Sequence, residues 1–266
     1  MERYQKGEPY GSLIKEMISI IEENQPEKDF DVRFFMNYEE VKKKLVIRLV
    51  DWETNRELLS KVPFLEFQDL AVLCYCLVMS EEIGTGTILI HKEHLKYWNI
   101  DERELLRDAI ENASRIEPYQ IRKMSELVKD IMWESLQEQI NEICEEYVCD
   151  KETLLKSTLE NMSKELEEKQ IPMYVLTNQK RCYGASCLVY PNMLEILAEK
   201  LQDDFYIIPS SVHETIIIAK DGCMDSASLN SMIEEVNHTQ VDKEERLSDH
   251  TYLYVRKSKK LLSITN

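Results

Sequence analysis

The longest apolar run of the chain constrains the fold most, and it reads Asp69-Leu-Ala-Val-Leu-Cys-Tyr-Cys-Leu-Val-Met79. A run with no polar face must, as a strand, be covered on both sides. It is about half as long as the roughly 20 residues that a transmembrane helix needs. A loop with Gly84 and Gly86 separates it from a second apolar segment, residues 87–91. We therefore expect an antiparallel hairpin in the centre of a sheet.

The segments around this hairpin predict helices and short strands. An apolar stripe predicts a first helix over residues 11–23, and Asp101 with Glu104 forms a capping box for a helix that ends near Ile116. The remaining predicted elements are strands 32–35 and 44–50, a helical turn at 38–43, a helix over 51–60 and a short helix over 94–98. Together these elements make an N-terminal α+β half over residues 1–117.

Residues 118–170 have the pattern of a helical connector. Apolar residues recur at helical spacing from Pro118 to Tyr147 and again from Leu155 to Leu166. The polar faces are rich in glutamate, and the segment lacks the Gly, Ser and Pro density of a flexible linker. One interpretation of these acidic faces is that they mimic the charge spacing of DNA, and the simpler one is a solvated surface.

The C-terminal half, residues 171–266, returns to alternating strands and helices. Helix patterns follow Pro191 and Asp225. Strand patterns cover residues 173–177, 185–190, 205–208, 215–219, 251–255 and 261–264. The expected fold class is therefore α+β, with two mixed-sheet α/β halves bridged by acidic helices.

Two segments share an order of elements that suggests an internal duplication. Residues 70–97 and 173–201 each predict a strand, a loop with glycine, a strand that starts with small residues, and then a helix. A repeated supersecondary unit would give this pattern. The order is also common among unrelated α/β segments, so chance similarity is the alternative.

Charge and cysteine content bound the compartment and the partners. Fifty acidic and 33 basic side chains give a formal charge of −17, which repels phosphate backbones and disfavours nucleic-acid binding. The N-terminal residues lack an apolar signal segment, and no run is long enough to span a membrane. Seven cysteines in no regular framework indicate reduced thiols. We expect a cytoplasmic protein with a possible protein partner, and the oligomeric state stays open.

The densest group of reactive side chains lies in the segment Pro209-Ser-Ser-Val-His-Glu214. Ser210 and Ser211 are candidate nucleophiles, His213 a candidate base and Glu214 a candidate orienting carboxylate. On an extended strand only alternate residues share a face, so Ser211 and His213 are the pair that can act together. The alternative is structural: the serines bond the backbone of a turn, and His213 begins a strand.

No pattern in the chain predicts a metal site or a cofactor. His91 and His94 could share a helical face, but the spacing indicates no third ligand, so capping or surface roles are preferred. Gly84 and Gly86 are the only closely spaced glycine pair, without the lysine of a nucleotide loop. The cysteines at 74, 76, 144, 149, 182 and 187 are interpreted as inert thiols rather than zinc ligands.

Several short motifs are similar to those of one bacterial family. They are Asp69-Leu-Ala71, Gly86-Thr-Ile-Leu-Ile90, His94-Leu-x-x-Trp98, Leu176-Thr-Asn178, Tyr183-Gly-Ala185, Pro209-Ser-Ser-Val-His-Glu214, Asn237-x-Thr239-Gln240 and Leu247-Ser-Asp249-x-x-Tyr252-Leu-Tyr254. With these motifs most of the chain resembles the family of domain of unknown function 5688. The resemblance brings no established activity, catalytic residue or cofactor. It implies an accessory or regulatory protein in gene neighbourhoods that resemble mobile elements.

Two functions follow as expectations. The first is a soluble, non-enzymatic accessory or regulatory protein that acts by binding a macromolecule. The alternative is a hydrolase-like enzyme with Ser211 and His213 as catalytic candidates. Candidate binding residues for either function are Asn178, Ser210, Glu214, Asn237 and Asp249. An enzyme requires these polar groups to converge in a cleft, and a binding protein requires an exposed apolar patch or a continuous acidic surface.

Overall fold

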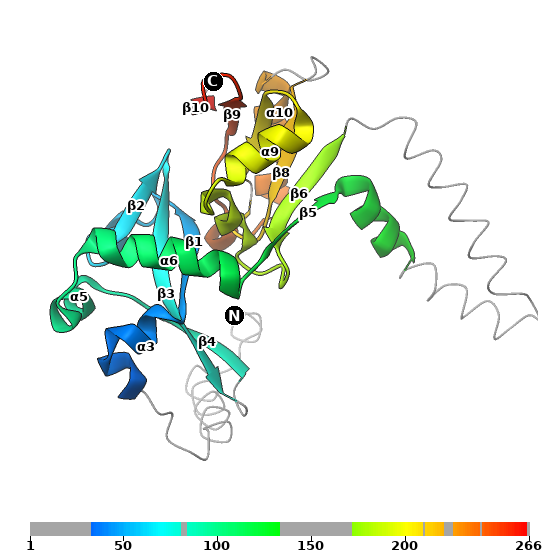
Figure 1. Cartoon of the computed structure of the whole chain (residues 1–266). Helices are drawn as coiled ribbons and strands as arrows, with labels where there is room; N and C mark the ends of the chain where they lie inside the picture. Colours follow the sequence, from blue (N-terminus) through cyan, green and yellow to red (C-terminus); the bar gives the residue numbers. More distant parts are fainter. Residues whose placement is uncertain are drawn as a thin grey trace, which may run out of the picture.

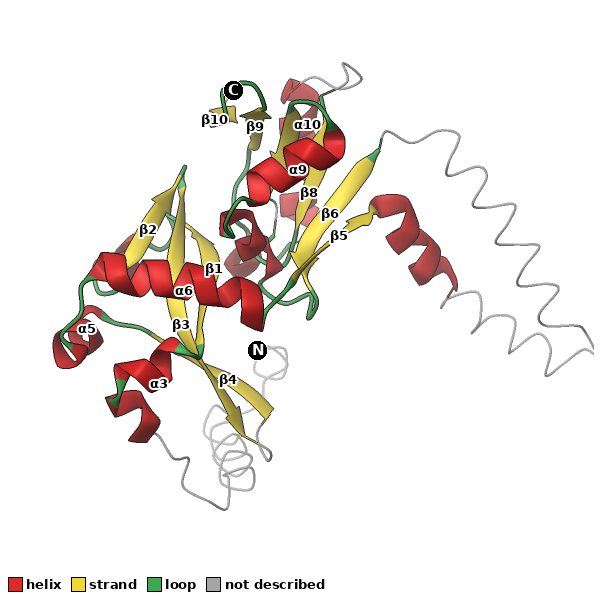
Figure 2. Ribbon diagram, in the orientation of Figure 1, coloured by secondary structure: helices red, strands yellow, loops and turns green. Residues whose placement is uncertain are grey.

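The computed structural model describes residues 33–80, 84–133, 172–209, 211–220, 226–239 and 241–264. Two sheets of four and six strands, with helices packed on them, make an α+β fold (Figures 1 and 2). All strand pairs are antiparallel, so the expectation of mixed sheets was wrong. The helices predicted over residues 11–23 and 155–166 lie outside the described residues, and no described helix is long and apolar enough to cross a membrane.

The predicted apolar run is the central strand of the N-terminal sheet. This strand, β3 (Leu70–Ser80), pairs with β1 (Leu45–Asp51), β2 (Phe64–Phe67) and β4 (Gly84–Leu89). Its residues 70–74 are fully buried, as a strand covered on both faces requires. The hairpin with β4 is confirmed in the register Tyr75↔Leu89.

Short helices surround this sheet. They are η1 (Arg33–Met36), α3 (Tyr38–Lys42), α4 (Arg56–Leu59), α5 (Lys92–Trp98) and α6 (Glu102–Ile116). The Asp101 half of the predicted capping box of α6 is confirmed, because Asp101 Oδ1 accepts a hydrogen bond of 2.8 Å from Glu104 N. The strand predicted at 32–35 was wrong: the segment is a 3₁₀ turn, and Trp98 Nε1 donates to the Phe35 carbonyl in place of a neighbouring strand.

The C-terminal sheet has the strand order β10-β9-β7-β8-β6-β5. Its strands are β5 (Tyr119–Lys123), β6 (Met173–Asn178), β7 (Phe205–Ile208), β8 (Thr215–Ala219), β9 (Thr251–Val255) and β10 (Lys260–Ile264), and its helices are α9 (Met193–Leu201) and α10 (Ser226–Thr239). A helix was expected to begin at Pro118, but β5 comes first and residues 124–133 then form a helix. The ladder of β5 along β6 outweighs the helical pattern of this segment.

A strand was expected over residues 185–190, but the segment forms a 3₁₀ helix, η2 (Gly184–Val189). A Cβ at Gly184 would lie 2.5 Å from Asn178 N and 2.7 Å from His213 O, so η2 is pressed directly onto the ends of β6 and the loop before β8. The segment 173–201 therefore lacks the second strand of segment 70–97. The structure does not show a duplication.

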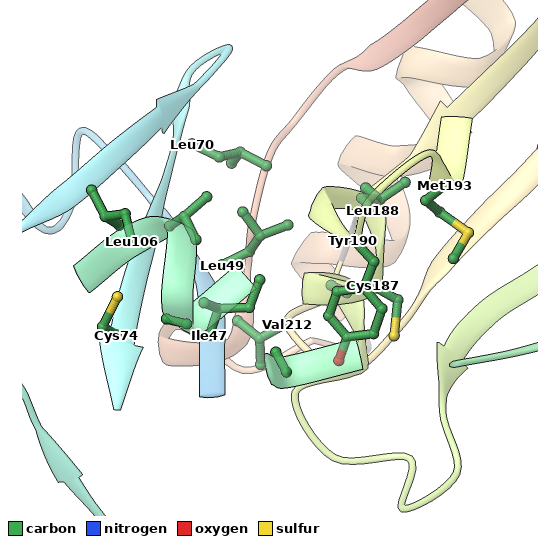
Figure 3. Packing of buried hydrophobic residues seen from close by; sticks show 14 of the residues in the cluster. Ile47, Leu49, Leu70, Cys74, Leu106, Cys187, Leu188, Tyr190, Met193 and Val212 are labelled. Carbon is green, nitrogen blue, oxygen red and sulfur yellow. The ribbon is translucent and has the colours of Figure 1, made fainter. Parts of the chain in front are cut away.

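One apolar core joins the two sheets. Ile47 and Leu49 of β1 pack in the same cluster as Cys187 and Leu188 of η2 and Val212 of the loop before β8 (Figure 3). A smaller cluster on the other face of the C-terminal sheet joins Leu229 and Ile233 of α10 to β7, β8 and β9. The shared core fixes loops of the C-terminal half beside the end of β1, and the polar sites lie along this junction.

Candidate functional site

Ser211 and His213 form a tight turn between β7 and β8, which we call the first Ser-x-His turn. Ser211 Oγ accepts a hydrogen bond of 3.0 Å from the backbone N of His213. The imidazole Nδ1 accepts a bond of 3.2 Å from Tyr183 N, and Nε2 lies 3.2 Å from Glu245 Oε1. The structure thus brings the predicted pair together through the backbone, while the imidazole faces two other groups.

The surroundings of the first turn hold it in place. Thr177 Oγ1 donates a bond of 2.7 Å to the carbonyl of His213. The Tyr183 ring lies 5.4 Å from the imidazole, and the guanidinium of Arg48 stacks 3.7 Å from the centre of that Tyr183 ring. Because Arg48 belongs to β1, this stack ties the first turn to the N-terminal sheet.

Asn178 supports the first turn indirectly, because its side chain bonds to a neighbouring loop. The side chain is fully buried, its Nδ2 donates 2.7 Å to Cys182 O, and its Oδ1 accepts from Cys182 N at 3.3 Å. These bonds close the loop that delivers Tyr183 to His213. Glu214 is exposed and lines a separate hollow of about 160 Å³ beside the helix at 124–133. Ser210 lies outside the described residues.

Asn237 and Asp249, two of the candidate binding residues, are bonded to each other. Asn237 Nδ2 donates 2.8 Å to Asp249 Oδ1 and 3.0 Å to the Ser248 carbonyl. Among the described residues no hydrogen bond joins these two to Asn178 or His213. The candidate residues therefore do not converge in one place.

A second Ser-x-His turn, residues 248–250, follows directly after this pair. Ser248 Oγ again accepts from the backbone N of its histidine, here at 3.3 Å. In this turn the same hydroxyl also lies 3.2 Å from Nδ1 of the His250 ring. The imidazole Nε2 lies 2.7 Å from Ser263 Oγ on β10 and 3.4 Å from Asp69 Oδ1. A hydroxyl, an imidazole and a carboxylate therefore meet in this turn.

Asp69 comes from the N-terminal half, immediately before β3. It accepts a hydrogen bond from the fully buried Tyr252 through Oδ1 and lies 3.4 Å from Ser248 Oγ through Oδ2. Burial alone raises the pKa of Asp69, but the interactions with His250 and Tyr252 outweigh it and hold the pKa below its ordinary value. Burial and the bond to Asp69 raise the pKa of Tyr252, which therefore stays a proton donor. Asp69 is the ionised partner of this network.

Two adjoining hollows share lining residues, and we call them together the inter-sheet groove. One has a volume of about 400 Å³ and is lined by Asp69, Ser248 and His250 of the second turn among others. The other has about 330 Å³ and is lined by Val212 of the first turn among others. The residues that line both hollows are Asp51, Thr54, Lys243 and Arg246. The groove is therefore lined by both acidic and basic side chains.

Sequence reasoning missed Asp69, Ser248 and His250 as site residues. The Ser-x-His spacing of the first turn occurs again at 248–250, so the repeated spacing was an available signal. Asp69 had no such signal beyond its place in a family motif, because 179 residues separate it from Ser248. Only the packing of the two sheets brings it to the second turn.

The described residues include no group of three or more His, Cys, Asp or Glu side chains that could hold a metal ion. His91 and His94 cap α5: His91 N donates 3.0 Å to His94 Nδ1. Burial raises the pKa of the Cys76 thiol to about 11, and it raises that of Cys187 to about 12. These thiols are therefore protonated and unreactive at neutral pH.

Comparison with known proteins places the chain by family alone. No curated protein and no solved structure matches it. The model described as a family of unknown function, DUF5688, matches residues 1–256 and so covers nearly the whole chain, the two Ser-x-His turns and Asp69 included. The chain belongs to the DUF5688 family.

Proposed function

We propose that the protein is a cytoplasmic accessory or regulatory protein that binds an extended segment of a protein partner in the inter-sheet groove. The observation that carries this proposal is the pair of adjoining hollows, which share the lining residues Asp51, Thr54, Lys243 and Arg246. One of these four residues is acidic, one carries a hydroxyl and two are basic. Two hollows in a row suit an elongated ligand better than a compact one.

The charges of the groove favour a polypeptide. Lys243 has no side-chain partner among the described residues, and Arg246 uses Nε to donate to Val241 O at 3.1 Å, which leaves its Nη groups for a ligand. Asp51 and Glu53 line the same hollow. A peptide offers acidic and basic side chains together with backbone donors and acceptors, so it can pair with lining residues of both charges. The net charge of −17 and the acidic lining residues both disfavour a phosphate backbone.

Selection from a displayed library of random peptides tests this proposal without knowledge of the partner. Peptides that bind the wild-type protein should be enriched over those that bind Lys243→Glu/Arg246→Glu, and they should carry both charge signs. The matched control is Lys257→Glu/Lys260→Glu, which changes the net charge equally on the exposed β9–β10 hairpin. Binding should weaken as salt rises. Equal recovery on the wild type and the groove variant contradicts the proposal.

A hydrolase-like enzyme around Ser211 and His213 is the second candidate. The contact of 3.2 Å between Glu245 Oε1 and His213 Nε2 favours it, because a carboxylate on an imidazole is part of many nucleophilic sites. This candidate requires the Ser211 hydroxyl to replace Tyr183 N at the other ring nitrogen. Covalent labelling with a fluorophosphonate probe tests it, because loss of the adduct in Ser211→Ala would identify Ser211 as the nucleophile.

A further inference from the structure

We propose that Ser248, His250 and Asp69 form a hydrolytic site for carboxylic esters or amides, with Ser248 as the nucleophile. The inference goes beyond binding in the inter-sheet groove and does not depend on it. Its basis is that all three side chains line the hollow of about 400 Å³ and lie within 3.2–3.4 Å of one another. Neither the family description nor the sequence motifs assign a role to this set.

The contacts of the His250 ring define the role of each group. With the proton on Nε2, the ring can donate toward Ser263 Oγ at 2.7 Å and Asp69 Oδ1 at 3.4 Å. Nδ1 is then an acceptor for the hydroxyl of Ser248 at 3.2 Å. Asp69 is itself fixed by Tyr252, so the carboxylate orients the ring and stabilises the imidazolium that forms during reaction. His250 is the general base and Asp69 the positioning residue.

The same hollow contains the positive charge that the reaction requires. Arg246 and Lys243 line it together with Ser248, and either can stabilise the oxyanion of a tetrahedral intermediate. The substrate class is therefore a carboxylic ester or amide.

The reaction is acyl transfer to serine followed by hydrolysis. Ser248 Oγ forms a bond to the carbonyl carbon as its proton passes to His250 Nδ1, and the carbonyl electrons move onto oxygen. The bond to the leaving alcohol or amine then breaks, and His250 returns the proton to that group. Water attacks the acyl-serine, His250 takes a proton from the water, and this proton returns to Ser248 Oγ when the carboxylic acid leaves.

The test is covalent labelling with a fluorophosphonate probe, followed by intact-mass measurement. We expect one adduct on the wild type, none on Ser248→Ala, and a labelling rate at least about 100-fold lower for His250→Gln. Ser211→Ala is the matched comparison, because it removes the same serine-to-backbone bond from the other Ser-x-His turn. Ser211→Ala should keep the adduct at the wild-type rate. Ser263→Ala tests the other hydroxyl on the His250 ring, and it should keep the adduct on Ser248 at an altered rate, because it removes the nearest partner of Nε2.

Each other outcome overturns the assignment. An unlabelled wild type or equal labelling of Ser248→Ala rejects the site, and loss only in Ser211→Ala supports the first turn instead. Loss only in Ser263→Ala rejects Ser248 as nucleophile. Tandem mass spectrometry of the wild-type adduct locates the modified serine directly, so the result stands even if a variant does not fold. Turnover of p-nitrophenyl acetate, lost in Ser248→Ala, provides a second measurement.

Discussion

The two Ser-x-His turns have the same local geometry and different chemical surroundings. In each, the serine Oγ accepts a hydrogen bond from the backbone N of the histidine two residues later, at 3.0 Å for Ser211 and 3.3 Å for Ser248. In the first turn Nδ1 of the ring accepts from a backbone amide, and in the second it faces the serine hydroxyl. The Ser-x-His spacing produces the hydrogen-bonded turn, and the partner of the imidazole ring determines which chemistry the turn can support.

The residues that contact the two imidazole rings also come from different parts of the chain. Glu245 and Tyr183, which contact His213, both belong to the C-terminal half. Asp69, which contacts His250, comes from the N-terminal half. The carboxylate partner of the second ring is therefore in place only when the two sheets are packed together, whereas the bonded partners of the first ring come from one half. This difference predicts distinct responses to substitution.

The first turn depends on packing, and Gly184→Ala should break it with the largest effect. The new Cβ would lie 2.5 Å from Asn178 N and 2.7 Å from His213 O, and these backbone atoms cannot rotate away. We expect the free energy of unfolding to fall by about 3 kcal/mol. Urea denaturation measures this change. Gly86→Ala is the control, because no atom lies within 4 Å of its added Cβ, and a similar loss there contradicts the explanation.

The second turn depends on a carboxylate from the other sheet, so Asp69→Ala should cost about 2 kcal/mol. The substitution leaves the fully buried Tyr252 hydroxyl without its acceptor, and an unsatisfied buried donor is costly. Tyr252→Phe removes that donor and completes a double-mutant cycle. We expect the Asp69→Ala loss to shrink by at least about 1 kcal/mol in the Tyr252→Phe background. Additive losses would mean that Asp69 acts through other contacts.

The sequence predicted the elements whose signals lie within one short segment. The apolar run of β3 and the Asp101 cap of α6 are local signals, and both were confirmed. The strand predicted over residues 185–190 was wrong because a short apolar run fits a strand or a buried helix equally well. Residues 119–123 were misassigned because β5 is an edge strand whose partner, β6, begins 50 residues later at Met173.

The candidate site shows the same difference between local signals and contacts with distant residues. The sequence located Ser211 and His213 because their reactive groups are neighbours, and it found Asn237 and Asp249 through family motifs. It could not predict that Tyr183 N would donate a hydrogen bond to Nδ1 of His213, because that contact depends on how η2 packs. Nor could spacing reveal Asp69, which reaches His250 only across the sheet junction. Contacts between the halves carry the information that a linear pattern lacks.

The charge of Asp69 should give the second turn a pH dependence that Asp69→Asn removes. The pKa of Asp69 in the folded protein lies below its ordinary value of 3.8, so the ionised carboxylate stabilises the fold above that value. This stabilisation is lost as pH falls through the folded pKa. At pH 6 we expect the wild type to have a larger free energy of unfolding than Asp69→Asn in urea denaturation. This difference should shrink toward pH 3. A difference that is constant from pH 6 to pH 3 rejects an electrostatic role.

Removal of the matching carboxylate in the first turn should have the smallest effect. Glu245 is 46% exposed and His213 is 32% exposed, so solvent screens their contact, and such surface pairs contribute about 0.5 kcal/mol or less. After Glu245→Ala, Nδ1 of His213 still accepts from Tyr183 N, and Thr177 still holds the His213 carbonyl. Urea denaturation should therefore place Glu245→Ala within about 0.5 kcal/mol of the wild type. A loss as large as that of Asp69→Ala would mean that both turns depend on their carboxylates, and the contrast between them would fail.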